Sequence, residues 1–112
     1  MSDCIFCMIG RGEIPASVVY ANDDVLAFDD IAPQAPVHTL IIPRAHYANV
    51  ADDVPAELMV RVMEAIPRVA EAKGVAASGY RVIINTGPDA AQSVHHFHVH
   101  VLGGKAMAEG MV

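Results

Sequence analysis

Apolar and polar residues alternate along much of the chain in short stretches bounded by Gly, Pro, Asn or Asp, a pattern typical of β-strands. Five such stretches are predicted, at residues 17–20, 25–29, 37–42, 80–85 and 94–102. Asn22-Asp23-Asp24 predicts a hairpin between the first two. Residues 4–10 are expected to form a short helical turn. Because the connections are short and the helices few, we expect an α+β fold with a five-stranded antiparallel sheet.

In one longer segment the apolar residues recur at every third or fourth position, which is the spacing of a helix. Its apolar stripe consists of Leu58, Val62, Ala65, Ile66 and Val69. Asp52 or Asp53 is expected to cap this helix at its N-terminus, with Pro55 at the first helical position. Gly74 is expected to end the helix. Pro67 lies inside it and is expected to kink or weaken it, because proline has no backbone N–H to donate.

The length and composition favour one domain that associates with a second copy. A chain of 112 residues is enough for a single hydrophobic core, so residues 1–112 are expected to form one domain. Hydrophobic residues make up 54% of the chain without counting glycine, above the usual share of about 45–50% that includes it. So small a fold cannot hide that much apolar surface alone, and we expect a homodimer.

Charge and cysteine usage exclude several classes of protein. Lys and Arg number 7 against 13 Asp and Glu, a net charge of −6, which disfavours nucleic-acid backbones and anionic membranes as partners. The sequence has no signal-peptide pattern and no apolar run of about 20 residues. Its two cysteines, Cys4 and Cys7, are too close together for a secreted disulfide framework. We therefore expect a cytoplasmic protein that binds neither nucleic acid nor membrane.

Four of the six histidines fall within residues 95–100. On a strand, three of them share one face, while the apolar side chains between them point into the core. These three are His96, His98 and His100. A plain polyhistidine tract would not alternate in this way, whereas a tri-histidine metal site stays open as an alternative. Neutral imidazoles can attack phosphorus and bind anionic oxygens, and the middle ring, His98, is the best-placed nucleophile.

The run from His96 to Leu102, His-apolar-His-apolar-His-apolar-apolar, resembles the signature of the histidine triad (HIT) family. Gln92-Ser93-Val94 extends the likeness, which covers about residues 4–107. The segments from Leu26 to His38 and from Cys4 to Cys7 are similar to the Hint branch of that family. The resemblance implies a HIT-like α+β fold with one long helix, a short N-terminal helix and a five-stranded antiparallel sheet. It also implies a dimer in which the sheets of two subunits join.

The resemblance implies an enzyme. The expected activity is that of a purine nucleoside phosphoramidase, a nucleotidyl hydrolase that cleaves AMP–amine (P–N) or related nucleotidyl bonds. By that likeness His98 attacks the α-phosphorus and forms a nucleotidyl-histidine, which water then cleaves. His100 and His38 would orient the nucleophile and bind phosphate, and His96 would complete the catalytic histidines unless it serves a metal. No cofactor is implied for the reaction.

A nucleotide-binding set also follows from the resemblance. Ser93 and Asn85 would bind the phosphate or the leaving group, with Gln92 placed beside them, and Asp30 would take the two ribose hydroxyls. The purine would lie between apolar side chains, namely Ile5, Phe6, Phe28 and Ile31. Taken alone, these residues have plainer interpretations: Asp30 and Ser93 are common in turns, the apolar side chains in cores, and His38 suits a buried position.

Cys4-x-x-Cys7 raises the question of a second site. Two thiolates and two imidazoles suit a tetrahedral structural zinc, and likeness to zinc-carrying relatives of the family adds His46 and His96 as the other ligands. One alternative is two reduced core thiols with His46 at the surface. Another is a thioredoxin-like redox pair, which the lack of a flanking βαβ pattern disfavours.

The chain departs from the Hint pattern just before Gln92. Ala90-Ala91 stands where a glycine pair is usual, and an alanine is strained there if the loop needs a positive φ. Two other functions stay open: a nucleotide-binding or protein-interaction module, and a dinucleoside polyphosphate hydrolase. The segment from Phe28 to His38 and the pair of cysteines argue against the latter.

Overall fold

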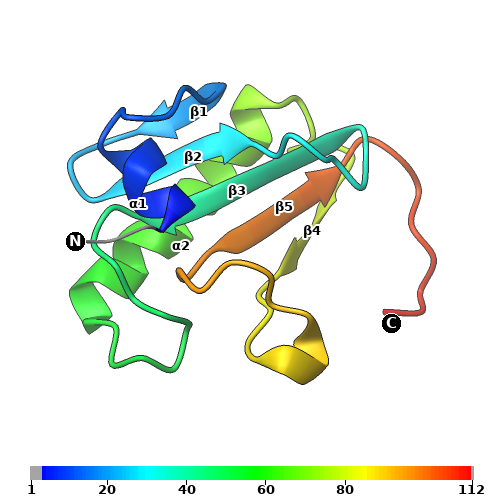
Figure 1. Cartoon of the computed structure of the whole chain (residues 1–112). Coiled ribbons are helices and arrows are strands. Elements are labelled where there is room, and N and C mark those ends of the chain that lie inside the picture. The colour runs from blue at the N-terminus through cyan, green and yellow to red at the C-terminus, as the bar shows by residue number, and fades with distance from the viewer. Residues whose placement is uncertain (1–3, 112) are drawn as a thin grey trace.

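A computed structural model describes residues 4–111 and contains a five-stranded antiparallel sheet in the order β1-β2-β3-β5-β4 (Figure 1). The strands are β1 (Val18–Ala21), β2 (Val25–Asp29), β3 (Val37–Pro43), β4 (Tyr80–Ile83) and β5 (Val99–Gly103). The helices are α1 (Ile5–Gly10), α2 (Ala56–Ala72) and the single 3₁₀ turn η1 (Pro88–Ala90). The predicted α+β fold, with one long helix and a short N-terminal one, is confirmed.

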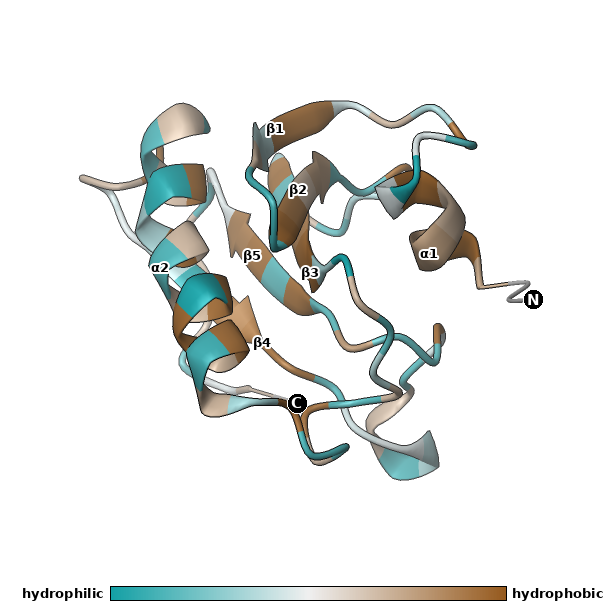
Figure 2. Cartoon of the chain, turned by 90° about the vertical axis from the view of Figure 1, so that its left-hand side faces the viewer, coloured by the Kyte–Doolittle hydropathy of each residue, from teal (hydrophilic) through white to brown (hydrophobic). Residues whose placement is uncertain are grey.

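The two α-helices lie on opposite faces of the sheet, α2 on one and α1 on the other (Figure 2). Side chains of β2 and β3 alternate between two cores, so these central strands are buried on both faces. The core on the α2 face contains Val25, Ala27, Ile41, Val62, Ala65, Val69, Phe97, Val99 and Val101. The core on the α1 face contains Phe6, Leu26, Phe28, Leu40 and Ile42. Functional side chains among these strands therefore belong to one face or the other.

The apolar stripe of α2 packs on the sheet as predicted, but the predicted N-cap is wrong. Pro55 is the N-cap, and no side chain caps the helix. The Asp52 carboxylate instead accepts a hydrogen bond from the Ala48 N–H at 2.7 Å, because it closes the loop that precedes the helix. Pro67 lies within the helix without ending it. Gly74 follows the last helical turn with φ of +75°, a conformation that glycine adopts without strain.

The last strand is shorter than predicted, because β5 begins at Val99 rather than at residue 94. Before it, the Phe97 N–H donates to the Tyr47 carbonyl at 2.6 Å, so the backbone pairs there with a loop and not with β3. The alternation of side chains persists nonetheless: Phe97 is 1% exposed in the α2-side core. Similarly, β4 ends at Ile83, which leaves Asn85 in the following connection.

No helix within residues 4–111 combines the length and the apolar character needed to cross a bilayer. The predicted cytoplasmic location stays a prediction.

Candidate active site

A cavity of about 230 Å³ lies on the α1 face of the sheet. It is lined by Ile5, Phe6, Ile9, Phe28, Asp29, Asp30, Ile31, Leu40, Ser93, Val94, His98 and His100. Part of the lining comes from α1, and the histidines and Ser93 complete it. Ligand pockets usually measure about 300–1,000 Å³, so this cavity suits a small ligand or one part of a larger one.

His98 is buried in this cavity with its ring orientation determined by the backbone. Its Nδ1 lies 2.7 Å from the carbonyl oxygen of His96, so Nδ1 carries the proton and donates it. In the neutral ring Nε2 then keeps its lone pair. Phe6 packs against the ring edge-on at a centroid distance of 5.1 Å. The sequence-predicted nucleophile therefore has one fixed tautomer and one basic nitrogen.

A second chain of hydrogen bonds determines the tautomer of His100. The Gln34 N–H donates to His38 Nδ1 at 3.0 Å, so the proton of a neutral His38 is on Nε2. That nitrogen lies 2.8 Å from His100 Nδ1, which must accept. The proton of His100 is consequently on its own Nε2. This Nε2 is the one buried side-chain nitrogen or oxygen without a hydrogen-bond partner among the described residues, and an unpartnered buried donor is ready for a ligand oxygen.

The electrostatics keep both of these rings neutral at neutral pH. Burial, and then the nearby His98 and His38, lower the pKa of His100 to about 4. Burial also lowers the pKa of His38, while the Asp30 carboxylate opposes that shift; Asp30 Oδ2 lies 3.5 Å from His38 Nε2. Asp30, His38 and His100 are close enough to share a metal ion. However, His38 Nε2 and His100 Nδ1 already share a hydrogen bond. These three side chains are therefore better suited to holding a proton between the two rings than to binding a metal.

Most of the predicted nucleotide-binding residues line the cavity. Ile5, Phe6, Phe28, Asp30, Ile31 and Ser93 do so. Ile31 is 99% exposed and therefore forms the rim. Asp30 also closes a turn, since its Oδ1 accepts from the Ala32 N–H at 2.9 Å. Asp30 therefore both stabilises this turn and lines the cavity.

Gln92 and Asn85 are not among the lining residues. The Gln92 amide bonds to backbone instead: its oxygen accepts from the Gly87 N–H at 3.1 Å, and its nitrogen donates to the carbonyls of Ala48 and Val94 at 2.7 and 3.0 Å. These hydrogen bonds hold the loop before Ser93, and the contact of Gln92 with the nucleotide stays a prediction. In the same loop Ala91 adopts a left-handed conformation with φ of +57°, the strained position that the missing glycine pair suggested.

Sequence reasoning missed three apolar lining residues, Ile9, Leu40 and Val94. Two of them carried a signal. Ile9 lies four residues after Ile5 and so one turn further along the same helix face. Leu40 lies two residues after His38 on a strand and so on the same face of the sheet.

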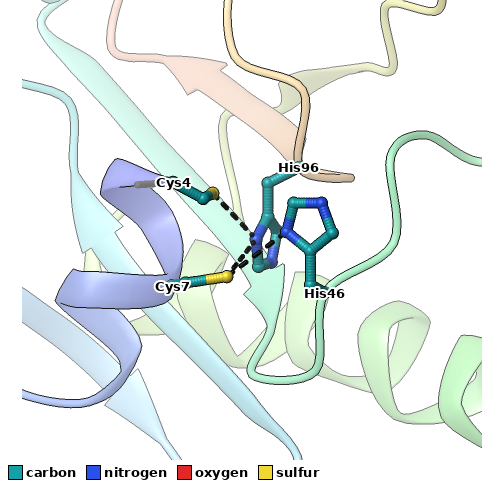
Figure 3. Close-up of side chains that lie close together, drawn as sticks. All are labelled: Cys4, Cys7, His46 and His96. Carbon is teal, nitrogen blue, oxygen red and sulfur yellow. Dashed lines mark hydrogen bonds between the residues drawn. The ribbon is translucent and has the colours of Figure 1, made fainter. Parts of the chain in front are cut away.

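A separate cluster of ligand-type side chains lies beside the cavity (Figure 3). Cys4 and Cys7 point from α1 toward His46 and His96, and the four ligand atoms lie within 4.8 Å of one another. His96 Nδ1 lies 3.4 and 3.5 Å from the two sulfurs, and His46 Nδ1 lies 3.3 Å from Cys7 Sγ. Tetrahedral zinc bonds of about 2.3 Å to sulfur and 2.0–2.1 Å to nitrogen separate sulfur from nitrogen by about 3.5 Å. The spacing of the side chains therefore fits zinc.

The protonation of His96 also fits a metal. Its Nε2 lies 2.8 Å from the Pro43 carbonyl and donates to it, which leaves the Nδ1 lone pair directed at the sulfurs. Metal-bound histidines commonly use their second nitrogen in this way. The His96 ring is fully buried and does not line the cavity. Within the described residues, His96 contacts His98 through its backbone carbonyl and not through its ring.

Comparison with known proteins agrees with this geometry. The family model of the HIT domain matches residues 11–107. The purine nucleoside phosphoramidase of Escherichia coli is 44% identical over 108 residues, which cover 94% of this chain and 90% of that protein. An uncharacterized HIT-like protein of Synechococcus elongatus is also 44% identical over 108 residues, covering 95% and 94% of the two chains.

Solved structures give the same result. A HIT family hydrolase from Clostridium thermocellum superposes with a TM-score of 0.94 at 41% identity, over 100% of this chain and 99% of that one. A histidine triad protein from Clostridium difficile superposes with a TM-score of 0.91 at 42% identity, over 99% and 98%. These relatives support a hydrolase activity, and the chain belongs to the HIT domain family.

Proposed function

We propose that the protein is a purine nucleoside phosphoramidase, a nucleotidyl hydrolase that cleaves the P–N bond of AMP–amine conjugates through a nucleotidyl-histidine. One observation carries the proposal. His98, whose Nε2 keeps its lone pair, and His100, whose Nε2–H has no hydrogen-bond partner, both line one cavity. A fixed nucleophile beside a donor for a phosphoryl oxygen is the arrangement that attack on phosphorus requires. The named activity of the Escherichia coli relative supports the same chemistry.

In the first step, His98 Nε2 forms a bond to the α-phosphorus as the bond from phosphorus to the amine breaks. The amine leaves with one proton taken up from its surroundings. His100 donates its Nε2–H to a non-bridging oxygen, where negative charge must be stabilised. In the second step, water attacks phosphorus and the bond to His98 breaks, with its electron pair returning to Nε2. The water gives up one proton to solvent, which balances the one that the amine took up, and AMP leaves. His38 acts through its 2.8 Å hydrogen bond, which keeps the proton of His100 on the nitrogen away from His38.

The remaining lining residues can hold the nucleotide. A carboxylate accepts hydrogen bonds from two neighbouring hydroxyls, so Asp30 suits the ribose. Ser93 lines the same cavity as His98 and suits the phosphate or the leaving group. The purine would lie against the apolar part of the cavity lining, which includes Phe28, Ile5 and Ile31. Asn85 lies outside the lining, and its proposed contact with the leaving group requires a substrate that extends beyond the cavity.

Hydrolysis of adenosine 5′-phosphoramidate, followed by AMP release, tests the proposal. We expect turnover by the native protein and a loss of at least about 10³-fold in His98→Ala, because no other group can form the intermediate. The matched control is His95→Ala, since His95 is an exposed neighbouring histidine outside the cavity. Diadenosine polyphosphate assayed in parallel separates the two hydrolase classes. Wild-type turnover by His98→Ala, or faster cleavage of the polyphosphate by native protein, overturns the assignment.

We also propose that Cys4, Cys7, His46 and His96 bind one structural zinc ion, which would cross-link α1 to the loop after β3 and to the segment before β5. Their spacing and the protonation of His96 support this. The hydrolytic steps need no metal. Elemental analysis of protein prepared with Zn²⁺ should find about one zinc per chain, and Cys4→Ser should lose most of it. An equal zinc content in both preparations would contradict the site.

The exposed face of α2 supports a homodimer, which we propose as the assembly. Val60 and Met63 are 51% and 39% exposed, although the opposite side of the same helix fills the core. They line a shallow apolar hollow together with Val54, Ala56, Met59 and Glu64. A second copy would cover this surface. Sedimentation should give about 24 kDa for the native chain and about 12 kDa for Met63→Glu; a native monomer at micromolar concentration would exclude the dimer.

A further inference from the structure

The short helix α1 contributes to both the metal cluster and the nucleotide cavity. Cys4 precedes it and Cys7 lies on it, while Ile5, Phe6 and Ile9 form one wall of the cavity. The helix has six residues, with no side-chain cap and no acidic residue in its first turn. A helix of this length has little stability of its own in water. Its place in the fold therefore depends on the contacts that it makes with the rest of the protein.

Those contacts lie at both ends of the helix and at Phe6 between them. At its C-terminal end, Arg44 donates to the Gly10 carbonyl at 2.8 Å. At its N-terminal end, the two cysteines lie against the histidines of the cluster at 3.3–3.5 Å. Phe6 packs between these regions, edge-on to both His96 and His98 at centroid distances of 6.0 and 5.1 Å. Phe6 also packs against Phe28 in the α1-side core at a centroid distance of 5.5 Å. The N-terminal half of α1, which carries two cavity residues, is thus held both by this core contact and by the cysteines.

The cluster is also joined to the nucleophile from a second direction. His96 belongs to the cluster through its ring, while its carbonyl accepts the Nδ1–H of His98 at 2.7 Å. Any movement of His96 changes the acceptor that determines the tautomer of His98. Two independent connections, one through Phe6 and one through the His96 backbone, therefore run from the cluster to the cavity.

We infer that Cys4, Cys7 and His46 are positioning residues for the nucleotide, so that zinc and AMP bind this protein cooperatively. The inference rests on the proposed function, since it concerns the same cavity. With the cluster loaded, the wall formed by α1 is ordered before AMP arrives; without metal, AMP binding must order that wall itself. The coupling is reciprocal, because thermodynamic linkage requires AMP to strengthen zinc binding by the same factor.

Two binding titrations measure the coupling without measuring turnover. Calorimetric titration with AMP is carried out on the zinc-loaded protein and on protein stripped with a chelator. We expect the dissociation constant for AMP to rise at least about tenfold on stripping, within the 5- to 150-fold typical of coupled sites. Zinc affinity, measured by competition with a chromophoric chelator, should rise by the same factor when AMP is saturating.

His46 provides the sharpest variant, because it is exposed and does not line the cavity. His46→Asn should weaken zinc and AMP binding together, although the residue cannot touch the nucleotide. His46→Cys supplies another zinc ligand and should restore both affinities. The matched control is Met8→Ala, which alters α1 at a residue outside both the cluster and the cavity lining and should leave both affinities unchanged.

The outcomes separate this inference from the proposals on which it rests. Equal AMP affinity in loaded and stripped protein overturns the coupling and leaves the phosphoramidase proposal intact. A zinc-loaded protein that does not bind AMP overturns the proposed function, and the coupling with it. No uptake of zinc, or weakened AMP binding in His46→Asn that His46→Cys fails to restore, overturns the positioning role of the cluster.

Discussion

The partly buried, neutral state of His100 makes the stability of the fold depend on pH in a defined window. The pKa of this ring is about 4 in the folded chain, against 6.5 for an ordinary histidine. Between these values the unfolded chain binds a proton that the folded chain does not. The free energy of unfolding must therefore fall as the pH is lowered from about 6.5 to about 4. Above about pH 6.5 neither state is protonated, and this contribution is fully present.

The size of the effect follows from the two pKa values. A difference of one in pKa corresponds to 1.36 kcal/mol, so the difference here allows at most about 3 kcal/mol; because the ring is not fully buried, we expect about 2 kcal/mol. His100→Gln is the matched variant, since its amide can still accept from His38 but does not titrate. Urea unfolding of both proteins at several pH values between about 4 and 7 gives the difference. The His38 and His96 rings, whose pKa values burial also lowers, are present in both.

The result that would refute this reasoning is a parallel pH dependence of the two chains. If native and His100→Gln proteins lose the same free energy of unfolding between about pH 7 and pH 4, His100 is not held neutral by its surroundings. The assigned donor on its Nε2 would then also lack support.

Four other substitutions give results that urea unfolding can check. Ala91→Gly should stabilise the fold by about 0.5 kcal/mol, because relief of the left-handed conformation exceeds the added chain entropy; Ala90→Gly, in η1, should destabilise it instead. Phe97→Ala should cost about 3–5 kcal/mol through the cavity left in the α2-side core, and a loss below about 1 kcal/mol would contradict the burial described. Lys73→Met removes the 2.9 Å ion pair with Asp29 and should cost about 0.5–1 kcal/mol, an effect that 1 M salt should largely abolish.

The alternation of residues around His98 was sufficient to place side chains correctly even where the predicted secondary structure was wrong. Phe97 and Val99 face the α2-side core, and His98 faces the cavity, although the strand begins only at Val99. An extended backbone alternates its side chains whether or not it pairs with a neighbouring strand. Pairing is different, because it depends on which distant segment lies alongside. The bond from the Phe97 N–H to the Tyr47 carbonyl has no signature in the sequence.

Polar residues in loops were the hardest to interpret from sequence, because their hydrogen bonds are made to whichever backbone group lies near. Asp52 has the residue type of a helix cap, yet it binds the Ala48 N–H. Gln92 stands beside Ser93, yet its amide bonds to the backbone of Gly87, Ala48 and Val94. The tautomer of His100 depends on the Gln34 N–H through His38. Each of these partners is brought in by the tertiary fold.

The order of the strands has a consequence for how the protein is made. β5 follows every other strand along the chain, yet it occupies an interior place between β3 and β4. While a ribosome is still synthesising the C-terminal segment, β3 presents an open edge of unsatisfied amides and carbonyls, which is a hazard for misassociation of nascent chains. When β5 pairs with β3, it covers this open edge and at the same time brings His98 and His100 to the cavity. Under the proposed function, catalytic competence would therefore arise only when the sheet is complete, and a prematurely terminated chain would have neither a closed sheet nor the proposed nucleophile.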